Sequence, residues 1–170
     1  MRGVLSTSTS TSKSKKTLAG IAGLVAAGLL FATVSTHEGE KLSTYYDPVG
    51  IATVCYGDTD PLMAVPGAAY SREECLRSLE RRLIAHAEPV LACLEIDPEA
   101  YPHQTAAFVS LAYNIGVDAF CESTAAKRWR AGDRAGACAA IEMWRFAKGK
   151  ELPGLVRRRA DERALCERNL

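Results

Sequence analysis

The chain has 170 residues, a hydrophobic fraction of 48% and a formal net charge of +1. This length suits one globular domain with an extension, and the composition is ordinary for a folded protein. The small charge argues against a nucleic-acid-binding protein, which would carry excess positive charge on its folded domain.

Residues 1–16 form a Ser/Thr-rich leader whose charged residues are all basic. The leader lacks the apolar periodicity that would bury one face, so we predict that it is disordered. The remainder of the chain is consequently net acidic.

Residues 17–34, TLAGIAGLVAAGLLFATV, are an uncharged run. As one helix this run would be about 27 Å long, near the thickness of a bilayer's hydrocarbon core. It fits a cleaved signal peptide, a permanent anchor or a releasable signal anchor, whereas a basic leader directly before it disfavours a buried core helix. Ala, Gly and Thr supply ten of its residues, so we expect a weak membrane hold and favour the releasable anchor.

Glu38, Asp47 and Thr53 follow in the spacing E-x8-D-x5-T. Two carboxyl groups and a hydroxyl in one cleft suit glycosidic hydrolysis, because one acid protonates the leaving oxygen while the other carboxylate steers water or stabilises positive charge. Glu, Asp and Thr are more often solvated surface residues or turn residues than catalytic ones. The rest of the sequence must therefore show whether these three form a catalytic site. We expect a short helix over 37–43 and then strands with turns at 47–48 and 57–58.

Helices dominate the rest of the predicted fold. Ser71-Arg72-Glu73-Glu74 is a capping box that opens a helix, which Pro89 should kink or end. A central core helix should run from Pro102 to Ile115 and stop at Gly116. Further helices should begin at Ser123, Asp133 and Pro153. Their charged faces, including Arg82 on the first helix and Arg157, Arg158 and Arg159 on the last, are predicted to be mostly solvated. For the last helix, the alternative is an internal arginine that pairs a carboxylate in the cleft.

The cysteines number six, at Cys55, Cys75, Cys93, Cys121, Cys138 and Cys166. No spacing typical of a zinc site occurs, so we expect neither a metal nor a cofactor. An even number behind an export signal indicates disulfides, for which 15 pairings are open. We favour the set that closes local loops: Cys55–Cys75, Cys93–Cys121 and Cys138–Cys166.

Three segments together resemble the phage-type lysozymes, an endolysin family whose motif is E-x8-D-x5-T. They are the segment from His37 to Asp58, the helix AAFVSLAYNIGVDAF from Ala106 to Phe120, and GLVRRRADERALC from Gly154 to Cys166. Three motifs in family order are far more specific than one. One departure is Asp58, where many relatives carry His, which puts a supporting hydrogen bond in question.

The resemblance implies an α+β, mainly α, two-lobed fold with a small β-lobe, a helical lobe and an N-terminal hydrophobic helix. It implies hydrolysis of the β-1,4 bond between N-acetylmuramic acid and N-acetylglucosamine in peptidoglycan glycan strands, causing host lysis. Glu38 would be the general acid, Asp47 the base or electrostatic partner, and Thr53 the residue that positions water. Asn114 and Gly116 would lie at the substrate cleft, although a plain helix end explains them equally well.

The same resemblance, to signal-anchor-release endolysins, implies residues 1–16 in the cytoplasm, 17–34 in the host inner membrane and a catalytic domain over 35–170 in the periplasm, later released. Host export machinery and a separately encoded holin or pinholin would be partners. Two alternatives stay open. A lytic transglycosylase would leave an anhydro-sugar, and a non-catalytic wall-binding or lysozyme-inhibiting protein would bind without lysing cells.

Overall fold

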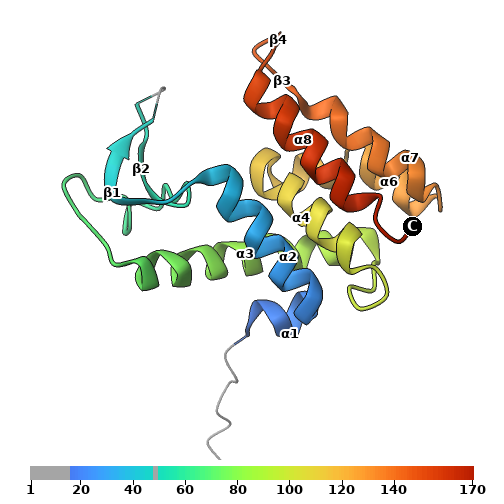
Figure 1. The fold of residues 1–170 in the computed structure, drawn as a ribbon, viewed down its shortest axis with the longest axis horizontal. Coiled ribbons are helices and arrows are strands. Elements are labelled where there is room, and N and C mark those ends of the chain that lie inside the picture. Colours follow the sequence, from blue (N-terminus) through green and yellow to red (C-terminus); the bar gives the residue numbers. More distant parts are fainter. Residues whose placement is uncertain (1–15, 48–49) are drawn as a thin grey trace, which may run out of the picture.

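The computed structural model describes residues 16–47 and 50–170, so all of the predicted leader except Lys16 lies outside the described residues (Figure 1). This part of the chain is mainly helical with two small antiparallel sheets, which agrees with the predicted fold class. Its elements are α1 (Leu18–Ala22), α2 (Leu24–Glu38), β1 (Lys41–Tyr46), β2 (Ala52–Cys55), α3 (Arg72–Leu94), α4 (Pro102–Ile115), α5 (Val117–Cys121), α6 (Thr124–Arg130), α7 (Arg134–Ala139), the 3-10 helix η1 (Ala140–Trp144), β3 (Phe146–Ala147), β4 (Lys150–Glu151) and α8 (Pro153–Cys166).

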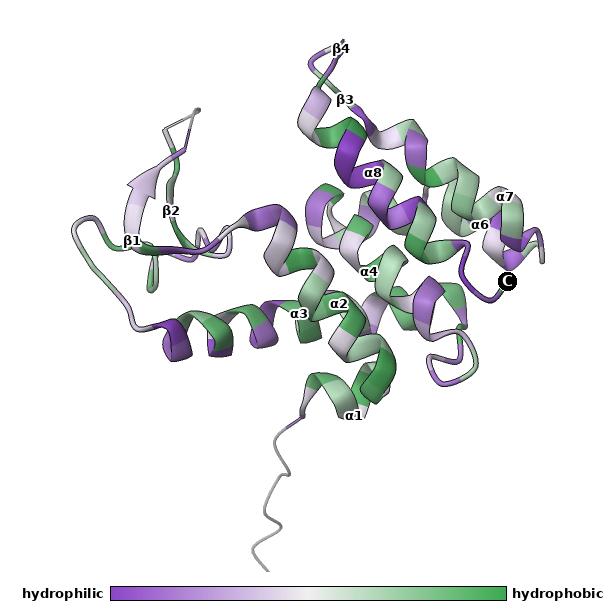
Figure 2. Cartoon of the chain, viewed as in Figure 1, coloured by the Kyte–Doolittle hydropathy of each residue, from purple (hydrophilic) through white to green (hydrophobic). Residues whose placement is uncertain are grey.

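The uncharged run over 17–34 forms two helices, so the prediction of one continuous helix is wrong. The break falls at Gly23, whose φ of 76° lies outside the helical region and suits glycine. One side of α1 and α2 is buried in the common core, through Leu18, Ala22, Ala26, Ala27, Leu30 and Val34. Figure 2 shows these two helices as largely hydrophobic ribbons, and α2 packs against α4.

Within residues 16–47 and 50–170, the structure contains no helix with the length and apolar character needed to cross a membrane. The predicted boundary between a signal anchor over 17–34 and a catalytic domain over 35–170 stays a prediction. In this structure α2 crosses that boundary, and both α1 and α2 belong to the same core as the rest of the fold.

The chain leaves α2 at Glu38 and turns into β1 through Gly39, which has a φ of 70°. The short helix predicted over 37–43 is therefore wrong in its second half, because residues 41–46 form a strand. β1 and β2 pair antiparallel, with Tyr45 opposite Thr53. This hairpin stands apart from the helices and joins them through the end of α2 and the loop to α3 (Figure 1).

α3 begins at the predicted capping box, with both reciprocal bonds between Ser71 and Glu74 present. It then runs through Pro89 to Leu94, so Pro89 does not end it. Pro89 and Ala85 are both exposed, and water can therefore solvate the Ala85 carbonyl that the proline leaves without a partner.

α4 has the predicted bounds and is the centre of the helical lobe, since every residue from Gln104 to Tyr113 is buried. Beyond it, Ser123 and Asp133 cap α6 and α7, and Pro153 is the first residue of α8, all as predicted. The side chain of Trp129 lies in the core against Phe108.

All three predicted disulfides are present: Cys55–Cys75, Cys93–Cys121 and Cys138–Cys166. The first ties β2 to α3, the second α3 to α5, and the third α7 to the end of α8. Each therefore fixes one element that borders the site described next.

Candidate active site

Glu38, the last residue of α2, holds its carboxylate between two distant parts of the chain. Its side chain is 20% exposed, and its Oε1 accepts a hydrogen bond of 2.7 Å from Nη1 of Arg158 on α8. Its Oε2 lies 2.7 Å from the position that a Cβ would take at Gly57, just after β2. Because Gly57 has no side chain, the carboxylate can rest against the base of the hairpin.

Asp47 and Thr53 meet around Ile51 in that same hairpin. Asp47 follows β1, and its Oδ1 accepts a hydrogen bond of 2.8 Å from the backbone N–H of Ile51. Thr53, in β2, donates its hydroxyl hydrogen to the Ile51 carbonyl at 3.0 Å and is buried. The structure thus places two of the predicted residues on the hairpin and the third, Glu38, at its base.

The backbone carbonyl of Tyr56 receives two hydrogen bonds from the helical lobe. The Tyr113 hydroxyl donates at 3.0 Å, and Nη1 of Arg82 donates at 3.1 Å while its guanidinium lies over the Tyr113 ring. Burial raises the pKa of Tyr113, so its hydroxyl stays a neutral donor. Arg82 is only partly exposed, and the prediction that it is simply solvated is wrong.

The C-terminal arginines divide between the two predicted alternatives. Arg157 is exposed, but Arg158 and Arg159 are buried. Both contact the fully buried Glu162: Nε of Arg158 lies 3.1 Å from its Oε1, and Nε of Arg159 lies 2.7 Å from its Oε2. The spacing R-R-x-x-E was the available signal, since positions three and four residues apart share a helix face. This spacing could indicate that the arginines pair with Glu162, but not that all three side chains are buried.

Asn114 and Gly116 lie at the end of α4. Asn114 is exposed, and its Oδ1 accepts a hydrogen bond of 3.1 Å from Nη1 of Arg159. Gly116 ends the helix with a φ of 91° and donates its N–H to the Ala112 carbonyl. Asn114 is therefore connected to Glu38 through the buried charges of α8, and its contact with a substrate stays a prediction.

Asp58, where the family resemblance leads one to expect His, is buried beneath the hairpin. Its carboxylate accepts hydrogen bonds from the Ser78 hydroxyl on α3 and from the backbone N–H of Asp60. The Asp58 carboxylate thus links the turn that follows β2 to α3.

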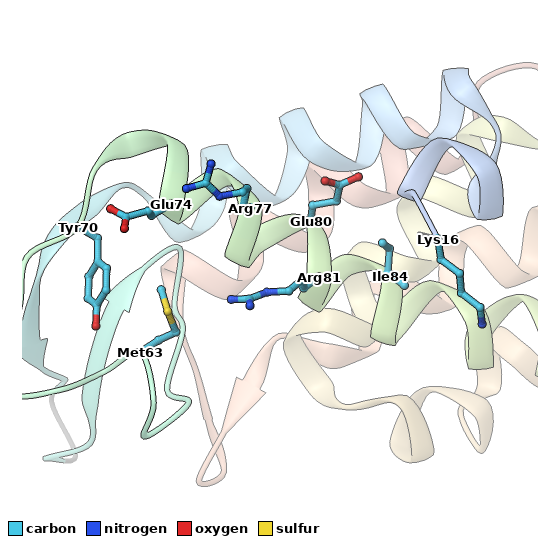
Figure 3. A pocket seen from close by; sticks show the side chains of 8 residues that line it. All are labelled: Lys16, Met63, Tyr70, Glu74, Arg77, Glu80, Arg81 and Ile84. Atoms are coloured by element: carbon cyan, nitrogen blue, oxygen red, sulfur yellow. The ribbon is translucent and has the colours of Figure 1, made fainter. Parts of the chain in front are cut away.

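A groove of about 550 Å³ lies on another face of α3 (Figure 3). Met63 and Tyr70 lie at one end and Lys16 at the other, with a row of α3 side chains between them. None of Glu38, Asp47 and Thr53 lines this groove, so we do not assign the candidate active site to it.

The sequence model of the Phage lysozyme family matches residues 35–162. One similar curated protein is the SAR-endolysin of Bacteriophage PS119, which is 37% identical in a match that covers 76% of this chain and 75% of the relative. Another is the SAR-endolysin of Escherichia phage 933W, which is 33% identical in a match that covers 87% of this chain and 91% of the relative. Among solved structures, the endolysin from Escherichia coli O157:H7 phage FAHEc1 is similar, with a TM-score of 0.74 and 27% identity over 84% of this chain and 92% of its own.

The chain therefore belongs to the phage lysozyme family. Within this family, the homologues place the chain in the SAR-endolysin subtype. The protein is therefore a lysozyme-type peptidoglycan hydrolase.

Proposed function

We propose that this protein is an endolysin that hydrolyses the β-1,4 bond between N-acetylmuramic acid and N-acetylglucosamine in peptidoglycan, and so lyses the host. The observation that carries the proposal is the setting of Glu38, a partly buried carboxylate paired with Arg158 at the base of the hairpin that bears Asp47 and Thr53. Family membership supports the peptidoglycan substrate.

In this proposal Glu38 acts in its protonated form and gives that proton to the leaving glycosidic oxygen, while Asp47 acts as the base or stabilises the positive charge that develops on the sugar. The Thr53 hydroxyl gives its one hydrogen to Ile51. Its two lone pairs then remain to accept a hydrogen bond from the attacking water. The hairpin would thus hold the water while α2 presents the acid.

Replacing Glu38 tests the assignment. Glu38→Gln keeps the shape and removes the acid, so it should lower the rate of turbidity loss of permeabilised Gram-negative cells by about 100-fold or more. The melting temperature should stay close to that of the native chain. Glu122→Gln, at a distant exposed position, is the matched control and should lyse normally. A lytic Glu38→Gln variant would reject the assignment, and anhydro-sugar ends on the released muropeptides would favour a transglycosylase.

We further propose that residues 17–34 first act as a signal anchor in the host inner membrane, with the leader in the cytoplasm, and that host export machinery places the catalytic domain in the periplasm. The names of the SAR-endolysin relatives support this localisation. Ala26, Leu30 and Val34 fill the core here, so they cannot occupy a bilayer at the same time. The anchored form would lack these core contacts.

Glu38 follows Val34 by four residues, which span at most about 14 Å even when fully extended. An anchored chain would therefore hold Glu38 near the membrane surface and away from Arg158. Release of residues 17–34 would let α2 dock against α4 and bring the acid to the hairpin. The proposal accordingly makes the anchored enzyme inactive.

Exposed positions of α1 and α2 allow a direct test. Ala19 and Gly28 face solvent, and no atom lies within 4 Å of a Cβ added at Gly28. Ala19→Leu/Gly28→Leu should hold the chain in the membrane and delay lysis without disturbing the core. Ala19→Ser/Gly28→Ser is the control and should be released normally. Full lytic activity in a purified membrane-bound fraction would contradict the proposal.

A further inference from the structure

Glu162 is a fully buried carboxylate on α8, and the polar contacts that hold it come from residues other than the three predicted catalytic ones. Its Oε1 accepts hydrogen bonds from the Ser110 hydroxyl at 2.7 Å, from Nε of Arg158 at 3.1 Å and from Nη2 of Arg159 at 3.0 Å. Its Oε2 lies 2.7 Å from Nε of Arg159. A buried carboxylate with this many donors is held in one orientation.

We propose that Glu162 is a positioning residue for the reaction at Glu38; this inference rests on the function proposed above. The connection runs through one rigid group, the Arg158 guanidinium. Its Nε faces Glu162, its Nη1 donates to Glu38, and its Nη2 lies 3.5 Å from the Ser110 carbonyl. Because a guanidinium is planar, fixing its Nε edge also fixes the direction of Nη1.

The backbone supports the same role. Arg158 and Glu162 are one helical turn apart on α8, so the helix itself sets their geometry. Ser110 lies on the buried central helix α4. Glu162 therefore ties the arginine that contacts the acid both to its own helix, α8, and to α4.

Charge gives Glu162 a second effect on Glu38. The charged and titratable groups around the Glu38 carboxylate include Arg158 and Arg159 from α8, Arg82 from α3, Tyr113 from α4 and the neighbouring His37. Without the Glu162 carboxylate, two buried guanidiniums would lose their shared counter-charge. Their uncompensated positive charge would favour the ionised form of Glu38, which cannot donate a proton.

The test compares Glu162→Gln with Glu167→Gln, which removes the same charge at an exposed position at the end of α8. We expect Glu162→Gln to lower kcat on soluble labelled glycan strands by roughly 10- to 100-fold while KM changes by less than about threefold, because misplacement of the acid affects the chemical step. The alkaline limb of its pH–rate profile should move to lower pH. Glu167→Gln should behave as the native enzyme.

A structural role alone predicts something different. Activity would then fall in proportion to the folded fraction, with an unmoved pH profile, and this result would overturn the inference. If Glu162→Gln does not fold, Ser110→Ala decides, since it removes only the hydroxyl bond to Oε1. A severalfold lower kcat at an unchanged melting temperature supports positioning, and an unchanged kcat overturns it.

The two proposals fail in different ways. Native-like activity in Glu38→Gln would reject the proposed function and this inference with it. An inactive Glu38→Gln variant together with native-like kcat and pH profile in Glu162→Gln would reject the inference alone.

Discussion

The carboxylate of Glu38 occupies the space that a side chain at Gly57 would need: its Oε2 lies 2.7 Å from the Cβ position there. The φ of Gly57 is also positive, at 72°. Gly57 is thus constrained both by its backbone conformation and by the proposed general acid.

Gly57→Ala should therefore impair catalysis beyond its effect on stability. A left-handed backbone costs a non-glycine residue about 1–2 kcal/mol, and the added methyl group must also displace Glu38. We expect a fall in kcat of about 10-fold or more, measured at a temperature where the variant stays folded. Gly67→Ala provides the control, because its φ is 80° and no atom lies within 4 Å of its Cβ position. Equal losses of activity in both variants would argue against a special contact at Gly57.

Gly23→Ala should weaken the docking of α1 and α2. Its φ is 76°, and an added Cβ would come within 2.6 Å of a carboxylate oxygen of Glu99. We expect a loss of about 1–2 kcal/mol in the free energy of unfolding, measured with urea, plus the cost of moving Glu99. Gly39→Ala, with a φ of 70° and an open Cβ position, carries the backbone cost alone. A smaller loss at Gly23 than at Gly39 would contradict the close approach.

Removing the Cys138–Cys166 disulfide should lower stability by about 3–4 kcal/mol, since it closes a loop with a sequence separation of 28. Both cysteines are fully buried, so Cys138→Ala/Cys166→Ala is the appropriate pair. The loss would be read from urea unfolding under oxidising conditions. Reduction of the native chain should produce at least the same loss, and a smaller effect of reduction would show that this bond is not formed in solution.

Stability should fall as the solution is acidified below about pH 6.5. Burial, followed by the positive charge of Arg158, lowers the pKa of His37 from its ordinary 6.5, and burial likewise lowers the pKa of His86. The unfolded chain then binds protons more readily than the folded chain. The stabilisation is complete above pH 6.5, and it is lost as the pH falls through the lower pKa values of the folded state.

His37→Gln/His86→Gln should flatten this decline. Urea midpoints measured between pH 8 and about pH 5, before carboxylates dominate, give the comparison. Between pH 7 and 8 the variant and the native chain should have the same slope, which serves as the internal control. An equally steep decline below pH 6.5 in the variant would assign the effect to other groups.

Local chemistry predicted much of this fold. The capping box at Ser71, the bounds of the helix from Pro102 to Ile115 and the helix starts at Ser123 and Asp133 depend on residues within one or two turns. The three disulfides followed from choosing local loops. The motif of Glu38, Asp47 and Thr53 was visible as spacing, and its catalytic role stays a proposal.

Interpretations failed where burial depends on a distant partner. The helical pattern favoured a solvated face for Arg158 over pairing with a cleft carboxylate, yet Arg158 is buried and paired with Glu38, 120 residues away. The run from residue 17 to 34 is broken at Gly23 and packs into the core in this structure, while its role as a membrane anchor stays a proposal. An apolar stretch suits a bilayer and a protein interior equally well, so its composition cannot decide between them.

From the sequence, most helical segments could be predicted, one set of cysteine pairs was favoured and three residues could be suspected, because capping, periodicity and spacing act over short distances. The tertiary structure alone decided that α8 supplies the partner of Glu38 and that a glycine makes room for its carboxylate. Both contacts join segments far apart in the chain: one requires charges to be removed from water, and the other requires space for the carboxylate. No local sequence pattern encodes such contacts.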